Sequence, residues 1–131
     1  MKSLIVEDDF ASRILMQNFL LPHGESHVAI NGKEAITAFS LAINSQEPYQ
    51  LICLDIMMPE MDGQTALREI RAIESSKGIM LGDGAKIIMT TALSDIDNKI
   101  NAINEFCDGY LVKPIDRSKL LELIRSFDLI K

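Results

Sequence analysis

The sequence has few residues of several kinds, and each shortage excludes a class of protein. Only two cysteines, Cys53 and Cys107, occur in 131 residues, which is too few to cross-link a secreted scaffold and fits no zinc-binding spacing. No apolar run is long enough to span a bilayer, and the short run after Met1 already ends at Glu7, so we expect neither a membrane span nor a signal peptide. The sequence therefore predicts reduced cysteines and a cytoplasmic protein with no membrane partner.

Basic residues are also scarce relative to acidic ones. There are 13 Lys and Arg residues against 19 Asp and Glu residues, which gives a net charge of −6. Binding to nucleic acid draws on a basic surface, so we expect no direct nucleic-acid partner. The length and the hydrophobic fraction of 47% fit one compact domain over residues 1–131 and exclude two independent domains.

Short strand-like apolar runs alternate along the chain with longer runs at helical spacing, which is the pattern of a βα protein. No heptad, internal repeat or low-complexity segment interrupts this alternation. The glycine-rich segment from Ser76 to Ala85 is predicted to be a surface loop. Strands are predicted over residues 2–6, 26–30, 51–54, 86–90 and 110–112, and helices are predicted around residues 11–19, 35–43, 66–73, 96–103 and 117–127.

The predicted fold is an α/β doubly wound, five-stranded parallel sheet of the flavodoxin-like kind, with strand order 2-1-3-4-5. Right-handed crossovers place helices on both faces of such a sheet. Strands one and three then flank the topological switch point, and ligands bind outside their carboxyl ends. Because Asp8 and Asp9 follow the first strand and Asp55 follows the third, we expect three carboxylates to converge there.

The chemistry of three clustered carboxylates calls for a cation. Like charges a few ångströms apart repel each other, so the cluster must gain a counter-ion or take up protons. All-oxygen ligation favours Mg²⁺, which leaves positions for phosphate and water. Thr90, Thr91 and Lys113 end the fourth and fifth predicted strands, so a hydroxyl and an ammonium are expected to face the acids. These groups together indicate phosphoryl chemistry.

Four short motifs in this order resemble a response-regulator receiver domain of two-component signalling. Acidic pairs and Lys-Pro dipeptides are common individually, but their placement at four successive strand ends is specific, and the resemblance spans nearly the whole chain. The motifs are Val6-Glu7-Asp8-Asp9, the segment Leu54 to Gly63, Thr91-Ala92 and Lys113-Pro114.

The resemblance implies a role for each acid. Asp55 would be the phosphoacceptor that attacks a phosphohistidine on a sensor histidine kinase or a histidine phosphotransfer protein. Asp8, Asp9 and Asp55 would hold Mg²⁺ with help from the backbone carbonyl of Met57. Cations at the equatorial oxygens allow a carboxylate to reach an anionic phosphorus, so this assignment agrees with the physical chemistry.

The resemblance also implies a switch. Lys113 would pair with the phosphoryl group and Thr91 would hydrogen-bond to it, while Tyr110 would swing inward. These movements couple the site to the face formed by the fourth helix, the fifth strand and the fifth helix, where a downstream protein target binds. The Lys113-Pro114 peptide is expected to be cis.

The sequence argues against two other functions. A phosphatase of the haloacid-dehalogenase type has a general acid two residues after its nucleophile, but Met57 stands there and cannot donate a proton. A flavodoxin-like binder uses a Ser-, Thr- or Gly-rich phosphate loop, whereas the acids at 7–9 repel a bare phosphate. We therefore expect a signalling protein that catalyses only its own phosphorylation and dephosphorylation. The starting Met1 and the lack of a linker after Phe127 favour a stand-alone protein over a receiver domain excised from a hybrid kinase or multidomain regulator.

Overall fold

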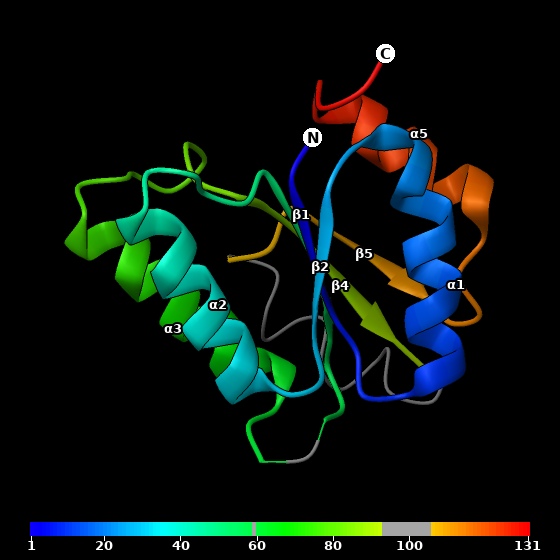
Figure 1. Cartoon of the computed structure of the whole chain (residues 1–131), viewed down its shortest axis with the longest axis horizontal. Helices are drawn as coiled ribbons and strands as arrows, with labels where there is room; N and C mark the ends of the chain where they lie inside the picture. Colours follow the sequence, from blue (N-terminus) through cyan, green and yellow to red (C-terminus); the bar gives the residue numbers. More distant parts are fainter. Residues whose placement is uncertain (59, 93–105) are drawn as a thin grey trace.

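A five-stranded, all-parallel sheet with strand order β2-β1-β3-β4-β5 forms the centre of the molecule (Figure 1). The computed structural model describes residues 1–58, 60–92 and 106–131. It confirms the predicted doubly wound class and strand order, whereas the predicted helix around residues 96–103 lies outside the described residues. The strands are β1 (Ser3–Val6), β2 (Ser26–Ala29), β3 (Leu51–Asp55), β4 (Lys86–Thr91) and β5 (Gly109–Val112); the helices are α1 (Phe10–Leu20), the short 3-10 helix η1 (Leu21–His23), α2 (Gly32–Asn44), α3 (Gly63–Ser76) and α5 (Arg117–Ser126).

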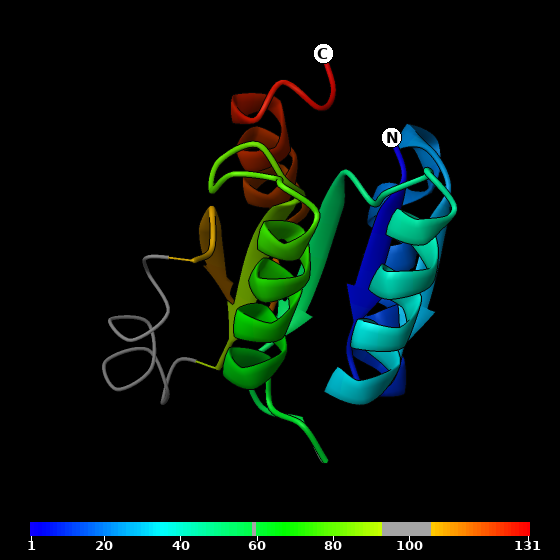
Figure 2. The ribbon, with the colours of Figure 1, turned by 90° about the vertical axis from the view of Figure 1, so that its left-hand side faces the viewer.

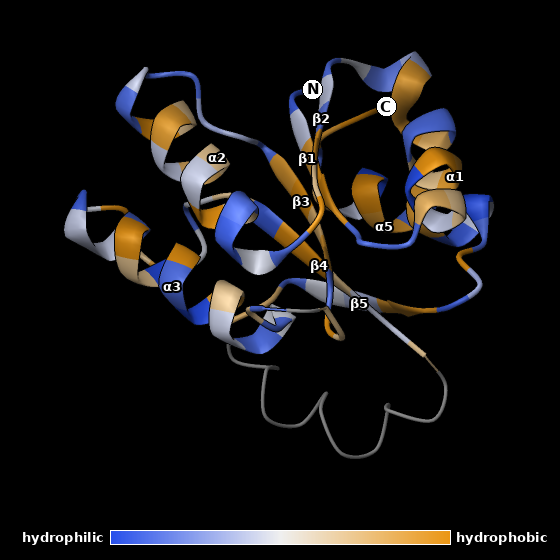
Figure 3. Cartoon of the chain, turned by 60° about the horizontal axis from the view of Figure 1, so that its bottom comes forward, coloured by the Kyte–Doolittle hydropathy of each residue, from blue (hydrophilic) through white to orange (hydrophobic). Residues whose placement is uncertain are grey.

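Helices cover both faces of the sheet, α2 and α3 on one and α1 and α5 on the other (Figures 1 and 2). Every residue of β1 and β3 is buried, as expected for central strands that are packed on both faces. Successive residues point to opposite faces, so Leu4 packs with the α2–α3 core and Ile5 with the α1–α5 core. Figure 3 shows the apolar sides of the helices turned toward the strands.

Each α-helix in the described ranges follows the carboxyl end of a strand, directly or after a loop. A side chain caps the first turn of each of these helices. Asp9, Asn31, Asp62 and Asp116 each accept a hydrogen bond from the backbone N–H three residues later, the N-cap geometry that these residue types favour. Parallel strands followed by helices bring the helix N-termini to the same edge of the sheet. Their partial positive charges therefore lie at the edge where the acids are expected.

The predicted loop between α3 and β4 is confirmed, since α3 ends at Ser76 and no helix or strand occurs before Lys86. Gly78 and Gly82 adopt φ angles of 79° and 97°, in the left-handed region that side chains disfavour. The backbone N–H of Asp83 donates to the Met80 carbonyl at 3.0 Å, which closes a tight turn at the tip.

Both cysteines are free thiols. Cys53 is buried in β3, and burial raises the pKa of its thiol to about 12, so it packs as a small apolar side chain as the sequence predicted. Within the described ranges, no helix has both the length and the apolar character that crossing a membrane requires.

Candidate functional site

The register of the central strands determines which acid lies beside Asp55. Asp55 is the last residue of β3, and Val6 pairs with Leu54 across the β1–β3 ladder. The next residue of the first chain segment is Glu7, which comes opposite Asp55. The backbone N–H of Glu7 also donates to Ala29 at 3.0 Å, so Glu7 continues the line of β1 into the carboxyl edge of the sheet.

Glu7, Asp8 and Asp55 form the acidic cluster of this edge. Each contributes a carboxylate oxygen, and these three atoms lie within 4.8 Å of one another. Glu7 and Asp55 are each only 4% exposed, while Asp8 is exposed. The structure therefore brings together two of the three predicted acids, Asp8 and Asp55, and adds Glu7.

Asp9, the third predicted acid, has a different place. Its carboxylate caps α1 by accepting a hydrogen bond from the Ser12 N–H at 2.9 Å. This bond lowers the pKa of the Asp9 carboxyl, so the capping group stays ionised. The prediction took the last two acids of the run Glu7-Asp8-Asp9, whereas the structure clusters the first two because helix α1 starts directly after Asp9.

Lys113 reaches the acids from the segment that follows β5. Its Nζ donates to Asp55 Oδ2 at 3.1 Å and forms an ion pair with Glu7 Oε1 at 2.5 Å. The ammonium thus lies between the two buried carboxylates, as the sequence reasoning placed it. The peptide bond between Lys113 and Pro114 is cis.

Burial and charge act against each other in this cluster. Burial raises the pKa of the Glu7 carboxyl above its usual value; Lys113 opposes the rise, and the nearby Asp55 adds to it. Burial alone would lower the pKa of Lys113, but the hydrogen bond to Glu7 and the charge of Asp55 outweigh burial and raise it. Lys113 therefore stays protonated, yet one ammonium faces three carboxylates. The excess negative charge favours a bound cation, and a set of carboxylate oxygens suits Mg²⁺.

The other predicted site residues, Thr91, Tyr110 and Met57, lie around the cluster, and Met57 contacts it through its backbone N–H. Thr91 ends β4 and is fully buried, and its hydroxyl donates to the carbonyl of Ala92 at 3.2 Å. Tyr110 lies in β5 and is 43% exposed. The backbone N–H of Met57 donates to Asp55 Oδ1 at 3.2 Å, and its side chain is exposed. The roles of Thr91, Tyr110 and the Met57 carbonyl therefore stay predictions.

Gly63 holds the loop after Asp55 close to the sheet, a role that the sequence reasoning did not assign. A Cβ atom at this position would lie 2.2 Å from the Asp55 carbonyl oxygen, so only glycine allows this approach. The Gly63 N–H donates to Ile56 at 2.9 Å. The start of α3 is thereby fixed against the backbone that carries Asp55.

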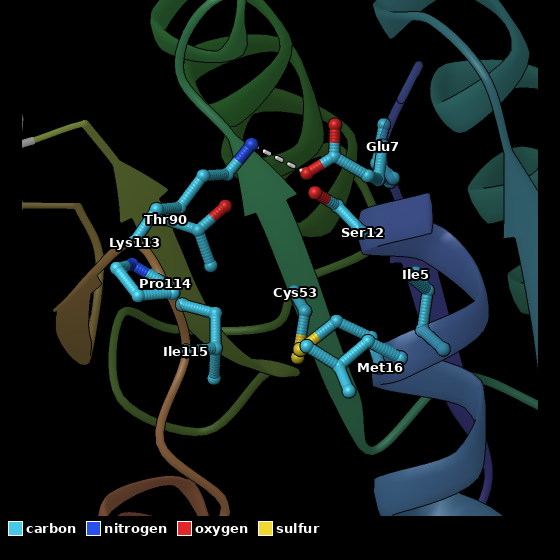
Figure 4. A pocket seen from close by; sticks show the side chains of 11 residues that line it. Ile5, Glu7, Ser12, Met16, Cys53, Thr90, Lys113, Pro114 and Ile115 are labelled. Atoms are coloured by element: carbon cyan, nitrogen blue, oxygen red, sulfur yellow. Dashed lines mark ion pairs between the residues drawn. The ribbon is translucent and has the colours of Figure 1, made fainter. Parts of the chain in front are cut away.

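A small cavity of about 70 Å³ lies behind the Lys113–Glu7 ion pair. Figure 4 shows this ion pair at one end of the cavity, with Ser12 beside Glu7, and Met16 and Cys53 at the other end. The lining is mostly apolar, so the charged groups face apolar side chains on that side. This environment strengthens their electrostatic interactions.

A family model described as the response regulator receiver domain matches residues 3–125. The chain belongs to this family. Among curated relatives, the chemotaxis protein CheY of Bacillus subtilis is 33% identical over 125 residues, covering 94% of this chain and 93% of that protein. The probable transcriptional regulatory protein SilR of Salmonella typhimurium is 31% identical over 126 residues, covering 96% of this chain but 50% of SilR. The receiver domain thus spans about half the length of several relatives.

Solved structures agree with this assignment. A mutant of the receiver domain of the histidine kinase CKI1 from Arabidopsis thaliana superposes with a TM-score of 0.81 at 28% identity, covering 97% of this chain and 88% of that one. Receiver domains are signalling proteins that bind Mg²⁺ at an acidic pocket, and response regulators interact with histidine kinases and downstream targets. Family membership favours the phosphoacceptor hypothesis over the phosphatase and flavodoxin-like alternatives.

Proposed function

We propose that this receiver domain, taken as one unit over residues 1–131, accepts a phosphoryl group on Asp55 from a phosphohistidine of a sensor kinase or phosphotransfer protein. The observation that carries the proposal is the position of the Asp55 carboxylate. It ends β3 at the topological switch point, is nearly buried, and contacts the Lys113 ammonium at 3.1 Å. A carboxylate in this setting can act as a nucleophile when its negative charge and that of the phosphoryl group are compensated.

Mg²⁺ fits the acids of the site, and the proposed ligands are Asp8, Asp55 and Glu7. Their carboxylate oxygens lie close enough to share one ion. Asp9 caps α1 through its Oδ2, and it stays a predicted ligand together with the Met57 carbonyl. When bound, the ion neutralises the oxygens of the incoming phosphoryl group.

The protein's own groups have distinct tasks in the transfer. One Asp55 oxygen forms the new bond to phosphorus while the bond from phosphorus to the histidine nitrogen breaks, and that nitrogen keeps the electron pair. The Met57 N–H and the Lys113 ammonium, which contact the two Asp55 oxygens at 3.2 and 3.1 Å, orient the carboxylate before the attack. Lys113 then pairs with the phosphoryl group, and the Thr91 hydroxyl turns from Ala92 to hydrogen-bond with it.

The proposed output is a change of the face formed by the fourth helix, β5 and α5, which binds a downstream protein. The fourth helix, predicted around residues 96–103, lies outside the described residues. Support comes from Thr91, whose carbonyl accepts from the Lys113 backbone N–H at 2.7 Å, and from the half-exposed Tyr110 in the neighbouring strand. A coupled threonine and tyrosine provide the two-state element that such a switch needs.

Phosphorylation is expected to depend on Mg²⁺. With acetyl phosphate as donor, the protein should gain the mass of one phosphoryl group in Mg²⁺, because the ion offsets repulsion between the donor and the acids. In EDTA the initial rate should fall by about a hundredfold or more, since the lost charge compensation is worth several kcal/mol. Intact-mass time courses measure both rates, and excess Mg²⁺ added back serves as the control. Equal rates with and without EDTA would contradict the proposal.

The phosphorylated state is expected to last longer than that of fast, chemotaxis-type receiver domains. Met57 and Leu93 follow Asp55 and Thr91 by two positions, and neither can orient a hydrolytic water by hydrogen bonding. Leu93 lies outside the described residues. Replacing Met57 with Asn and Leu93 with Glu should speed loss of the phosphoryl group about tenfold, or about 1.4 kcal/mol of barrier.

This lifetime is measured by intact mass after the phosphodonor is removed. Met80→Asn is the matched control, because Met80 is another exposed methionine and lies in the loop between α3 and β4, away from Asp55. A double variant that dephosphorylates no faster than the parent would show that these two side chains do not control access of water.

A further inference from the structure

One basic side chain contacts the loop that carries the acids. Arg13 lies in the first turns of α1, and its Nη1 donates to the backbone carbonyl of Glu7 at 3.2 Å and lies 3.5 Å from that of Asp8. Its guanidinium also stacks over the Phe10 ring, with Cζ 5.4 Å from the ring centre. The side chain thus folds back from the helix onto the peptide groups of both acids.

Helix stability does not account for this arrangement. A cation close to a helix N-terminus opposes the helix dipole and is unfavourable there. Among the residues that the structure describes, Arg13 forms no salt bridge with a carboxylate, and its side-chain hydrogen bonds go to the carbonyl oxygens of residues 7 and 8. The contact therefore acts on the backbone of the acidic segment.

Other hydrogen bonds hold the two ends of the acidic segment, and Arg13 holds the two carbonyls between them. The Glu7 N–H is held by the sheet through Ala29, and the Glu7 carboxylate accepts from the Asp9 N–H at 3.1 Å. The Asp9 side chain is engaged with Ser12. The hydrogen bonds from Arg13 to the Glu7 and Asp8 carbonyls restrict rotation of these two peptide groups. The direction in which the Glu7 and Asp8 side chains point is thereby fixed.

We propose that Arg13 is a positioning residue, whose hydrogen bonds to the Glu7 and Asp8 carbonyls hold these two acids in the arrangement that binds Mg²⁺. This inference rests on the proposed function. It has a distinctive sign, because the guanidinium and the ion are both positive. The charge of Arg13 alone weakens Mg²⁺ binding, whereas its hydrogen bonds strengthen binding by fixing the ligands.

The test compares Mg²⁺ affinities without any phosphodonor, by following backbone amide shifts during a titration with MgCl₂. Arg13→Gln should bind Mg²⁺ about tenfold more weakly, the lower range for loss of a group that orients metal ligands. Arg13→Lys keeps the charge but lacks the planar guanidinium that lies over the Phe10 ring and directs Nη1 to the two carbonyls, so it should also bind more weakly than wild type.

Arg125→Gln is the matched control. Arg125 donates to the main-chain oxygen of the last residue, Lys131, at 3.2 Å, and it lies at the far end of α5, so its replacement removes the same charge away from the acids. Its Mg²⁺ affinity should equal that of wild type. Thermal unfolding in EDTA checks that each variant is folded, and Arg13→Lys suffices for the test if Arg13→Gln does not fold.

The outcomes distinguish a failure of the positioning role of Arg13 from a failure of the proposed Mg²⁺ site. Tighter or unchanged Mg²⁺ binding in Arg13→Gln, or wild-type affinity in Arg13→Lys, would overturn the positioning role. A wild-type protein that shows no Mg²⁺-dependent shifts would instead overturn the proposed metal site itself. Weaker binding in both Arg13 variants with an unchanged Arg125→Gln control would support the assignment.

Discussion

Asp55→Asn is expected to abolish phosphorylation of the protein by acetyl phosphate or by a phosphorylated kinase. The substitution keeps the shape of the side chain but removes the charged oxygen that attacks phosphorus, and a neutral amide is a poor nucleophile. Intact mass measured in Mg²⁺ should show no added phosphoryl group.

Asp62→Asn is the matched control for this experiment. Asp62 lies in the same loop and caps α3 by accepting from the Thr65 N–H at 2.8 Å, and asparagine caps a helix about as well as aspartate. This variant should gain mass at the wild-type rate. A mass gain in Asp55→Asn that matches wild type would show that another residue accepts the phosphoryl group, and peptide mapping would then identify it.

The sequence was sufficient to place Asp55 because a buried strand has a simple signature. The four apolar residues before Asp55 could fill only a strand packed on both faces, and the first charged residue after them marks the carboxyl edge. The same rule applied to β1 leads to Glu7, the first charged residue after Val6. The prediction named Asp8 and Asp9 instead, and the register of β1 against β3, which pairs Val6 with Leu54, explains why Glu7 lies opposite Asp55.

Positions set by contacts between distant segments could not be predicted in this way. Gly63 was recognised only as part of a motif, because its approach to the Asp55 carbonyl depends on how α3 packs. The apolar spacing of α3 marks Leu67 and Ile70 as core residues, and both are buried. Arg71 and Glu74 lie on the same helix and are buried too, although the charge of each suggests a solvated position.

Arg71 is the centre of a buried polar network at the opposite end of the sheet from Asp55. Its guanidinium donates to Glu74 at 2.7 Å, to Asp108 at 2.9 Å and to the carbonyls of Ala85 and Phe106 at 2.9 and 2.8 Å. Glu74 and Asp108 accept in turn from the backbone N–H groups of Ala85 and Ile87. The network therefore joins α3 to the starts of β4 and β5.

Arg71→Met is accordingly expected to have the largest effect on stability. Methionine fills much of the same volume but removes the cation that the buried Glu74 shares with the partly buried Asp108, which keeps only the Lys86 ammonium at 3.9 Å. Breaking a buried ion pair by removing one partner typically costs about 3–5 kcal/mol, a large part of the free energy of unfolding of a small domain. Urea unfolding in EDTA measures this difference without a contribution from Mg²⁺.

Arg68→Met provides the control, since Arg68 is an exposed arginine one turn earlier on the same helix and its replacement should change the free energy of unfolding by less than about 0.5 kcal/mol. Where the variant is folded, it should still be phosphorylated, since the network does not contact Asp55. A deficit no larger than that of Arg68→Met would mean that Glu74 and Asp108 are satisfied without Arg71, by their backbone N–H donors and, for Asp108, by Lys86, and that Arg71 is not what holds α3 to the two strands.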